Sequence, residues 1–204
     1  AEAEPRLACH SSAMNEAERE IAELAAGCIL AVERVTGVQL DYTQDTLPIL
    51  DHYLGEVKDA ASDVQELVAA MSGAYFGEVV RRTLGPARWH LGSGDPHEFR
   101  LEFEDVFLSF SPVGIALEAI AREEVEGSGA HFDLRPSDRE RVRAALELFG
   151  DTREDDYYRF GVRYEAIEQA VHTLATLEMQ HTPRRKFDAE AYARFRRDRD
   201  TLLH

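Results

Sequence analysis

The chain has 204 residues, of which 44% are hydrophobic and 30% are charged, so it can bury one sizeable core. Its 39 acidic and 23 basic residues give a net charge of −16, which argues against binding of nucleic acid or of an anionic membrane. No apolar run approaches the ~20 residues that a membrane-spanning helix requires.

The first residues and the cysteines bear on the compartment. Residues 1–13 lack the apolar core of a signal peptide, and we expect a disordered leader there. Cys9 and Cys28 alone do not make a disulfide framework, which suits a reducing environment. Cys28 lies in the apolar run of a predicted helix, so we expect it to be buried, reduced and not bonded to Cys9. We therefore expect a cytoplasmic protein.

Three helices are predicted in the first part of the chain. The first occupies about 15–37 and the second about 43–57, with Thr43 as its cap. The third occupies about 63–84, where Gly85-Pro86 stops it.

A small antiparallel sheet is predicted in the middle of the chain. Apolar and polar residues alternate over 99–104 and again over 106–110, which is typical of half-buried strands joined in a hairpin. Residues 88–91 add a third strand. We expect all strands to fall within about 87–111, with the sheet packed against helices.

The remaining predicted elements are helices. They occupy about 112–125, 137–150, 164–179 and 188–199, the last one capped by Asp188. An S-x-x-E capping box begins the second of these helices, and a glycine ends it. The predicted fold class is therefore α+β, predominantly helical.

The predicted organisation has three parts. A disordered leader at 1–13 precedes a single α+β domain at 14–182, and a basic C-terminal helix or tail occupies 183–204. If the domain has two lobes, we place their boundary near 126–136.

The C-terminal segment 183–204 differs in charge from the rest of the chain. It carries seven basic and four acidic residues, a charge of +3, which leaves −19 on the remainder. Such a segment could dock on the acidic body or bind an acidic partner. We favour the simpler interpretation, an ordinary solvated helix.

Four stretches together resemble a known group of proteins. They are DYTQDTLPILD at 41–51, GAYFGEVVRR at 73–82, Trp89, and FLSFSPVGIALEAI at 107–120. This order is similar to that of small bacterial proteins of unknown function that share a GAYFGEVIRR…GG.W core and a later PF.KV turn. The resemblance covers roughly residues 14–125. It implies a common fold, and it implies no catalytic residue because the group has no established activity.

This chain departs from that group at two places. Gly85-Pro86-Ala87 stands where the group has a Gly-Gly turn, and the helix after Pro112 lacks the usual lysine. A function tied to that turn or to that lysine is not expected here.

The candidate binding residues lie around the third predicted helix. They are Tyr75, Glu78, Arg81, Arg82 and Trp89. In one interpretation Glu78 and the two arginines line a groove for an anionic group or a peptide, with Trp89 as its aromatic wall. In the alternative, which we favour, Glu78 and one arginine form a buried ion pair and Trp89 is a core residue.

Two glycines in the same helix add a packing prediction. Gly73 and Gly77 are four residues apart and form a notch that lets another part of the chain approach closely.

We predict no catalytic, cofactor or metal site. The chain has no G-x-S-x-G elbow, P-loop or G-x-G-x-x-G sequence. His90 and His97, with Asp95 between them, match no familiar metal-ligand spacing.

Three functions remain open. The leading hypothesis is a non-catalytic cytoplasmic protein-binding module whose partner has a basic surface. The alternatives are a small hydrolase or transferase with a Glu/Arg cleft, and an immunity or antitoxin protein that inhibits a basic toxin. A pocket containing Glu78 and the arginines would favour the enzyme, whereas a flat face or a buried, closed Glu78 ion pair would favour the module.

Overall fold

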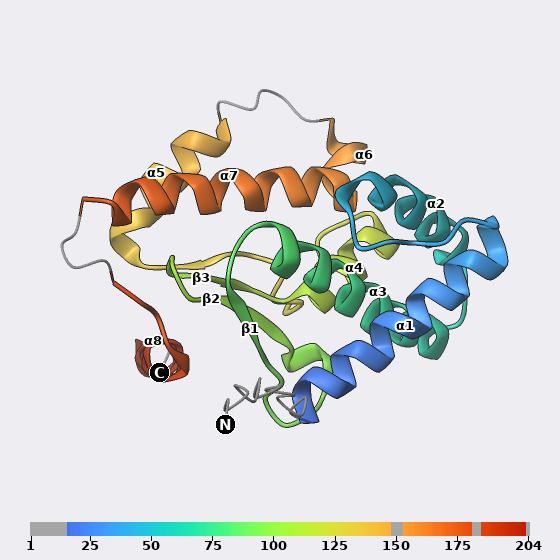
Figure 1. The fold of residues 1–204 in the computed structure, drawn as a ribbon, viewed down its shortest axis with the longest axis horizontal. Helices are drawn as coiled ribbons and strands as arrows, with labels where there is room; N and C mark the ends of the chain where they lie inside the picture. Colours follow the sequence, from blue (N-terminus) through green and yellow to red (C-terminus); the bar gives the residue numbers. More distant parts are fainter. Residues whose placement is uncertain (1–15, 148–152, 181–184, 203–204) are drawn as a thin grey trace, which may run out of the picture.

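The structure, a computed structural model, describes residues 16–147, 153–180 and 185–202. Helices make up most of these residues and surround a small antiparallel sheet, which confirms the predicted α+β, predominantly helical class (Figure 1). The helices are α1 (Glu16–Thr36), η1 (Gln44–Thr46), α2 (Leu47–Val57), α3 (Ser62–Thr83), η2 (Pro96–Glu98), α4 (Pro112–Ala121), α5 (Pro136–Glu147), α6 (Glu154–Tyr157), α7 (Phe160–Glu178) and α8 (Ala189–Leu202). The strands are β1 (Ala87–His90), β2 (Arg100–Phe103), β3 (Leu108–Phe110) and β4 (Asp133–Leu134).

The strands pair in the order β1-β2-β3-β4, each antiparallel to its neighbour. The first three lie within 87–111 as predicted. β4 lies beyond that range and pairs with β3, so the predicted limit of the sheet is wrong. A strand of two residues is too short to show the alternation on which the prediction depended. The sheet therefore extends into the stretch 126–136.

The inner face of the sheet belongs to the main hydrophobic core. Leu101 of β2 pairs with Phe110 of β3, and both side chains are completely buried. Phe76 of α3 stacks on Phe160 of α7, with 4.5 Å between the ring centroids. The same core therefore joins the middle of the chain to a helix near its C-terminal end.

The predicted notch on α3 is confirmed. A Cβ atom added to Gly73 would lie 2.6 Å from the Cα atom of Val113 in α4. One added to Gly77 would lie 2.3 Å from the indole ring of Trp89. Only glycine allows the α4 backbone and the Trp89 ring to approach α3 so closely.

Cys28 is buried in the main core and its thiol is free, as predicted. Burial raises the pKa of this thiol to about 12, although a hydrogen bond with Ser72 acts in the opposite direction. The thiol is therefore protonated at neutral pH and unreactive. Cys9 lies outside the described residues.

The start of α2 differs from the prediction. Thr43 precedes the short helix η1 and makes no capping bond with its side chain. Its backbone N–H and its hydroxyl instead both donate to the Asp41 carboxylate, at 3.0 and 2.6 Å. The helix proper begins at Leu47, so the predicted cap at Thr43 is wrong because the Asp41 side chain engages that residue.

The start of α5 also differs. The predicted capping box at Ser137 does not form, because α5 already begins at Pro136 and the Ser137 hydroxyl donates to the neighbouring Asp138 carboxylate. The predicted end of this helix, Gly150, lies outside the described residues. At α8 the prediction holds, since the Ala191 N–H donates to the Asp188 carboxylate at 2.9 Å.

Candidate binding site

The last turns of α3 bring an acid and two arginines together. The Glu78 side chain is almost completely buried, as are its chain neighbours Gly77 and Val79. Arg81 donates to both Glu78 carboxylate oxygens, from Nε at 2.7 Å and from Nη2 at 2.8 Å. Arg82 Nε donates to Glu78 Oε2 at 3.2 Å. The spacings of three and four residues place these groups on one side of a helix.

Trp89 completes this cluster from β1. Its indole Nε1–H donates to Glu78 Oε1 at 2.9 Å, and its ring lies against Gly77. The ring is partly exposed and packs against the main core. Both interpretations of Trp89 hold in part, since it packs on the core and also forms one wall of a pocket.

The environment fixes the charge on Glu78. Burial alone would raise its pKa, but hydrogen bonds from Arg81 and Trp89 and the charges of Arg81 and Arg82 outweigh burial and lower it. Both oxygens of the carboxylate already accept hydrogen bonds. An ionised, fully engaged carboxylate is a poor proton acceptor, so this arrangement holds side chains in place and does not resemble a general base.

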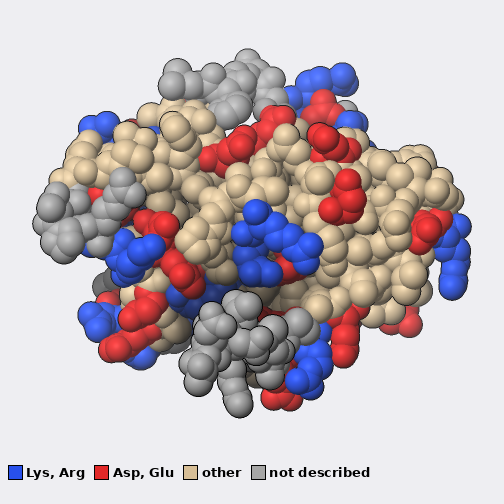
Figure 2. Space-filling view, in the orientation of Figure 1, with Lys and Arg blue, Asp and Glu red and all other residues tan. Residues whose placement is uncertain are grey.

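These residues line a pocket of about 370 Å³ between α1, α3 and β1. Figure 2 shows basic side chains gathered near the middle of this face, over the C-terminal end of α3, with acidic side chains to both sides. Arg82 lies over the Tyr42 ring, 3.7 Å from its centroid. The pocket is lined by Ala17, Glu18, Ala22, Tyr42, Glu78, Arg81, Arg82, Ala87, Arg88, Trp89 and Glu104.

Tyr75, another of the predicted binding residues, does not line this pocket. Its side chain is completely buried and its ring stacks on Tyr42, with 5.0 Å between the centroids. Its hydroxyl accepts from the Tyr42 N–H at 2.9 Å and lies 2.9 Å from the Thr46 hydroxyl. Tyr75 therefore packs against Tyr42 on the side of the core, and the Tyr42 ring contacts Arg82.

Two residues that line the pocket, Tyr42 and Arg88, are not among the predicted binding residues. Tyr42 has an unusual left-handed backbone conformation, with φ of 63°, which no sequence pattern announces. Arg88 precedes Trp89 on the same strand, so its side chain points to the opposite face of the sheet, and the alternation gives no indication that it also borders the pocket.

That opposite face carries a row of polar side chains across all four strands. Arg88, Glu102, Ser109 and Asp133 are directly opposite one another in register. The alternation predicts that the polar side of these strands faces water, but Glu102 and Ser109 are buried. The reason is that α8 covers this face, and Figure 1 shows α8 beside the sheet, viewed nearly end-on.

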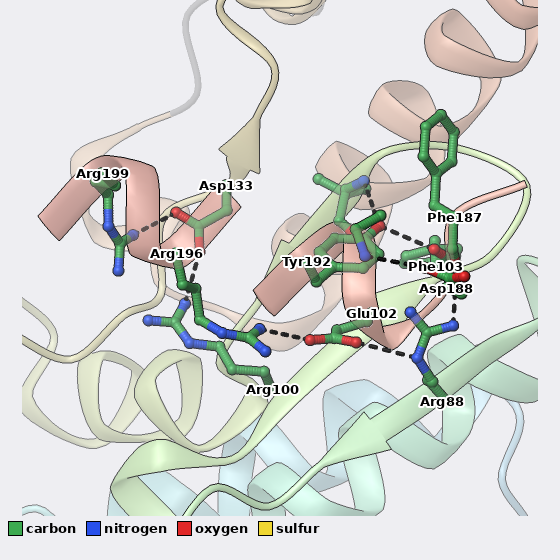
Figure 3. Close-up of polar contacts among 12 residues, drawn as sticks. Arg88, Arg100, Glu102, Phe103, Asp133, Phe187, Asp188, Tyr192, Arg196 and Arg199 are labelled. Atoms are coloured by element: carbon green, nitrogen blue, oxygen red, sulfur yellow. Dashed lines mark hydrogen bonds and ion pairs between the residues drawn. The ribbon is translucent and has the colours of Figure 1, made fainter. Parts of the chain in front are cut away.

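Ion pairs connect α8 to this row. The Glu102 carboxylate accepts hydrogen bonds from Arg88 Nε at 3.1 Å and from Arg196 Nη1 at 2.5 Å (Figure 3). The Asp133 carboxylate accepts hydrogen bonds from Arg199 Nη1 at 2.8 Å and from Arg100 Nη1 at 3.3 Å. The solvated-helix interpretation of the C-terminal segment is therefore wrong, and its docking on the acidic body is observed.

Tyr192 anchors the same helix to the turn between β2 and β3. Its hydroxyl accepts from the Leu108 N–H at 3.0 Å. The hydroxyl also lies 2.8 Å from the Phe103 carbonyl, 3.1 Å from the Val106 carbonyl and 3.0 Å from the Leu108 carbonyl. Burial raises the pKa of Tyr192, so the hydroxyl keeps the proton that it donates.

Within residues 16–147, 153–180 and 185–202, no three His, Cys, Asp or Glu side chains gather in a way that could hold a metal ion. Among the helices of these same segments, none combines the length and the apolar character needed to cross a bilayer.

Comparisons with known proteins give one match. A family model described as a family of unknown function (DUF6278) matches residues 2–103, which is half of the chain. No curated protein and no solved structure matches the chain. Of the residues that line the pocket, all but Glu104 fall within the matched segment, whereas α8 lies outside it. The predicted relation to a family of unknown function is confirmed.

Proposed function

The chain belongs to the family DUF6278, and we propose that it acts as a non-catalytic protein-binding module. The observation that carries this proposal is that both carboxylate oxygens of Glu78 are already hydrogen-bonded within the protein. Its carboxylate holds Arg81, Arg82 and Trp89 in fixed positions around a pocket, and none of the bonds at this carboxylate requires a substrate. Groups that are preorganised in this way favour recognition, because little side-chain freedom is lost on binding.

The chemistry of the pocket indicates what a partner would offer. Arginine side chains only donate hydrogen bonds, so the complementary group is a carbonyl or carboxylate oxygen. Arg81 and Arg82 are 39% and 47% exposed, which leaves part of each guanidinium accessible. We propose that a partner side chain or peptide carbonyl enters between them and Trp89.

The charge of the whole chain indicates the surroundings of that group. A net charge of −16 attracts a partner whose surface is basic overall, and the attraction weakens as salt rises. The proposed setting is the cytoplasm, in keeping with the free Cys28 thiol. An inhibitor of a basic toxin would be one protein of this kind.

One observation favours the enzyme alternative. Glu78, both arginines and Trp89 do line a pocket, which is the arrangement that we expected of a hydrolase or transferase. The argument against it is that Glu78 is the carboxylate at the centre of this cluster and its oxygens are engaged. We therefore place recognition first and keep catalysis as the second candidate.

The test is affinity capture from the native cell with three full-length proteins. They are the wild type, Arg82→Ala, and the control Arg143→Ala, which removes an arginine that is exposed and paired with Glu140 three residues earlier. We expect one protein to be retained by the wild type and the control and lost from Arg82→Ala. Identical retention by all three proteins would reject the pocket as the recognition site. Turnover of a substrate that requires Glu78 would establish the enzyme instead.

A further inference from the structure

The outer face of the sheet, which α8 covers, supplies all the groups that a bound helix needs. It offers the Glu102 and Asp133 carboxylates, the apolar ring of Phe107 and the backbone of the turn between β2 and β3. All of these groups come from residues that precede α5 in the chain. In this chain they are occupied by α8 (Figure 3).

The occupying helix carries a matching pattern on one side. Tyr192, Arg196 and Arg199 recur at four and three residues, which aligns them along a single helix face. Tyr192 stacks on Phe107 with 4.5 Å between ring centroids, and Phe195 meets the same ring at 5.1 Å. A helix with a tyrosine followed by arginines four and seven residues later therefore fits this face.

The contacts of α8 form a unit separate from the main core. Phe107, Phe187 and Tyr192 make a small apolar cluster of their own, with Ala191 and Phe195 against it. Among the described residues, the main core includes no side chain from 185–202. Removing α8 would uncover the sheet face without opening that core, which is typical of an element that can open locally.

We propose that this face is a docking site for a basic amphipathic helix of a protein partner, and that α8 is an intramolecular competitor for it. The site is distinct from the pocket at Glu78 and does not depend on the function proposed for that pocket. The charges select the partner, because the two carboxylates require cations and would repel a phosphate backbone or an anionic lipid.

The competition has a physical basis in tethering. A helix joined to the same chain is present at an effective concentration of about millimolar, so a free helix of equal intrinsic affinity is excluded until α8 is weakened. A partner displaces α8 either by binding more tightly or when α8 is modified.

The experiment uses a labelled synthetic peptide of residues 185–202 as the stand-in for the partner helix. It is titrated by fluorescence anisotropy against the full wild-type chain and against the full chain with Tyr192→Ala and Arg196→Ala. These changes weaken α8 and leave the docking face intact. The same peptide carrying both changes is the control ligand, and Arg196→Ala alone is a milder variant should the double variant unfold. Hydrogen exchange reports whether α8 is open in each chain.

We expect the peptide to bind the weakened chain at least about tenfold more tightly than the wild type, and the control peptide to bind neither. Binding should weaken as salt rises. No binding to a variant whose α8 amides exchange freely would overturn the proposal. Continued protection of α8 in both variants would also overturn it, because α8 would then be a fixed part of the fold. A dimer that exchanges α8 between copies would reassign the site to a second copy of this chain.

Discussion

Two buried glutamates, Glu78 and Glu102, are neutralised in different ways. Glu78 pairs with Arg81 and Arg82, three and four residues along the same helix, whereas Glu102 pairs with Arg88 and Arg196, 14 and 94 residues away. The arginines of the first cluster therefore come from the helix that carries the acid. Those of the second come from a neighbouring strand and from α8, so this cluster is complete only when α8 has docked.

The two clusters also differ in exposure. Arg81 and Arg82 are 39% and 47% exposed, but Arg88 and Arg196 are only 25% and 24% exposed. If the central carboxylate is lost, the first two guanidinium groups can turn into water more readily than the second two. The comparison teaches that the cost of removing a buried carboxylate depends on how well its arginine partners can be hydrated once it is gone.

The largest expected effect is that of Glu102→Gln. It leaves two poorly hydrated arginines without their common anion, and we expect the free energy of unfolding to fall by about 3–5 kcal/mol. Urea denaturation measures the loss, and hydrogen exchange should show that α8 opens first. An effect no larger than that of Glu78→Gln would contradict the comparison.

Glu78→Gln should have a smaller effect, about 2–3 kcal/mol, because it removes charge-assisted hydrogen bonds but leaves arginines that can reach water. Exchange should rise at the end of α3 and in β1, while α8 stays protected. If α8 opened as well, the two clusters would be coupled and the comparison would need to be revised.

The pH dependence of unfolding tests whether the loss of stability in Glu78→Gln comes from the lost charge. The pKa of Glu78 is lowered in the folded state, so its contribution is present above its ordinary pKa of 4.5 and is lost as pH falls through the folded value. The difference in unfolding free energy between the wild type and Glu78→Gln should therefore be constant near neutral pH and shrink below pH 4.5. Asp51, whose pKa is raised by burial, titrates in both proteins and cancels from the difference. A difference that persists at low pH would indicate packing as its cause.

Tyr75→Phe tests the support behind the pocket. It removes the hydroxyl that accepts from the Tyr42 N–H, and we expect a loss of about 1 kcal/mol. The partner captured by the wild type should still bind, since Tyr75 does not line the pocket. Loss of that partner at full stability would restore Tyr75 as a binding residue.

The smallest effect is expected at an exposed pair. Glu140 and Arg143 are three residues apart on α5, like Glu78 and Arg81, but both are well exposed. Glu140→Gln should leave the urea midpoint unchanged, because water replaces the lost interaction. A measurable loss would mean that spacing, rather than burial, determines the strength of such pairs.

The sequence predicted the Glu78 cluster because its members are local. Spacings of three and four residues on a helix determine which side chains meet, and no knowledge of the tertiary fold is needed. The same reasoning failed for Tyr75, since a tyrosine on an apolar helix gives no indication of where its hydroxyl finds a partner. The bond between Trp89 and Glu78 joins a strand to a helix, and no sequence pattern indicates which residues of the two elements meet.

The sequence could not decide between docking and solvation of α8, for a different reason. An amphipathic basic helix has the same pattern whether its polar side meets water or buried acids. Likewise, Glu102 occupies a polar position in an alternating strand, which normally indicates solvent. Both patterns indicate the local structure correctly, and only the tertiary fold shows that they face each other.

Arg88 has a thermodynamic consequence because it belongs to both regions. Arg88 is one of the residues that line the pocket at Glu78, and its guanidinium donates to the Phe187 carbonyl, 3.0 Å away, just before α8. If a ligand in the pocket shifted Arg88, the bond to the Phe187 carbonyl would be strained and the attachment of α8 would weaken. By linkage, detachment of α8 must then change the affinity for that ligand by the same factor. One arginine thus provides a route by which binding at the pocket and attachment of α8, on opposite sides of a strand, would be coupled.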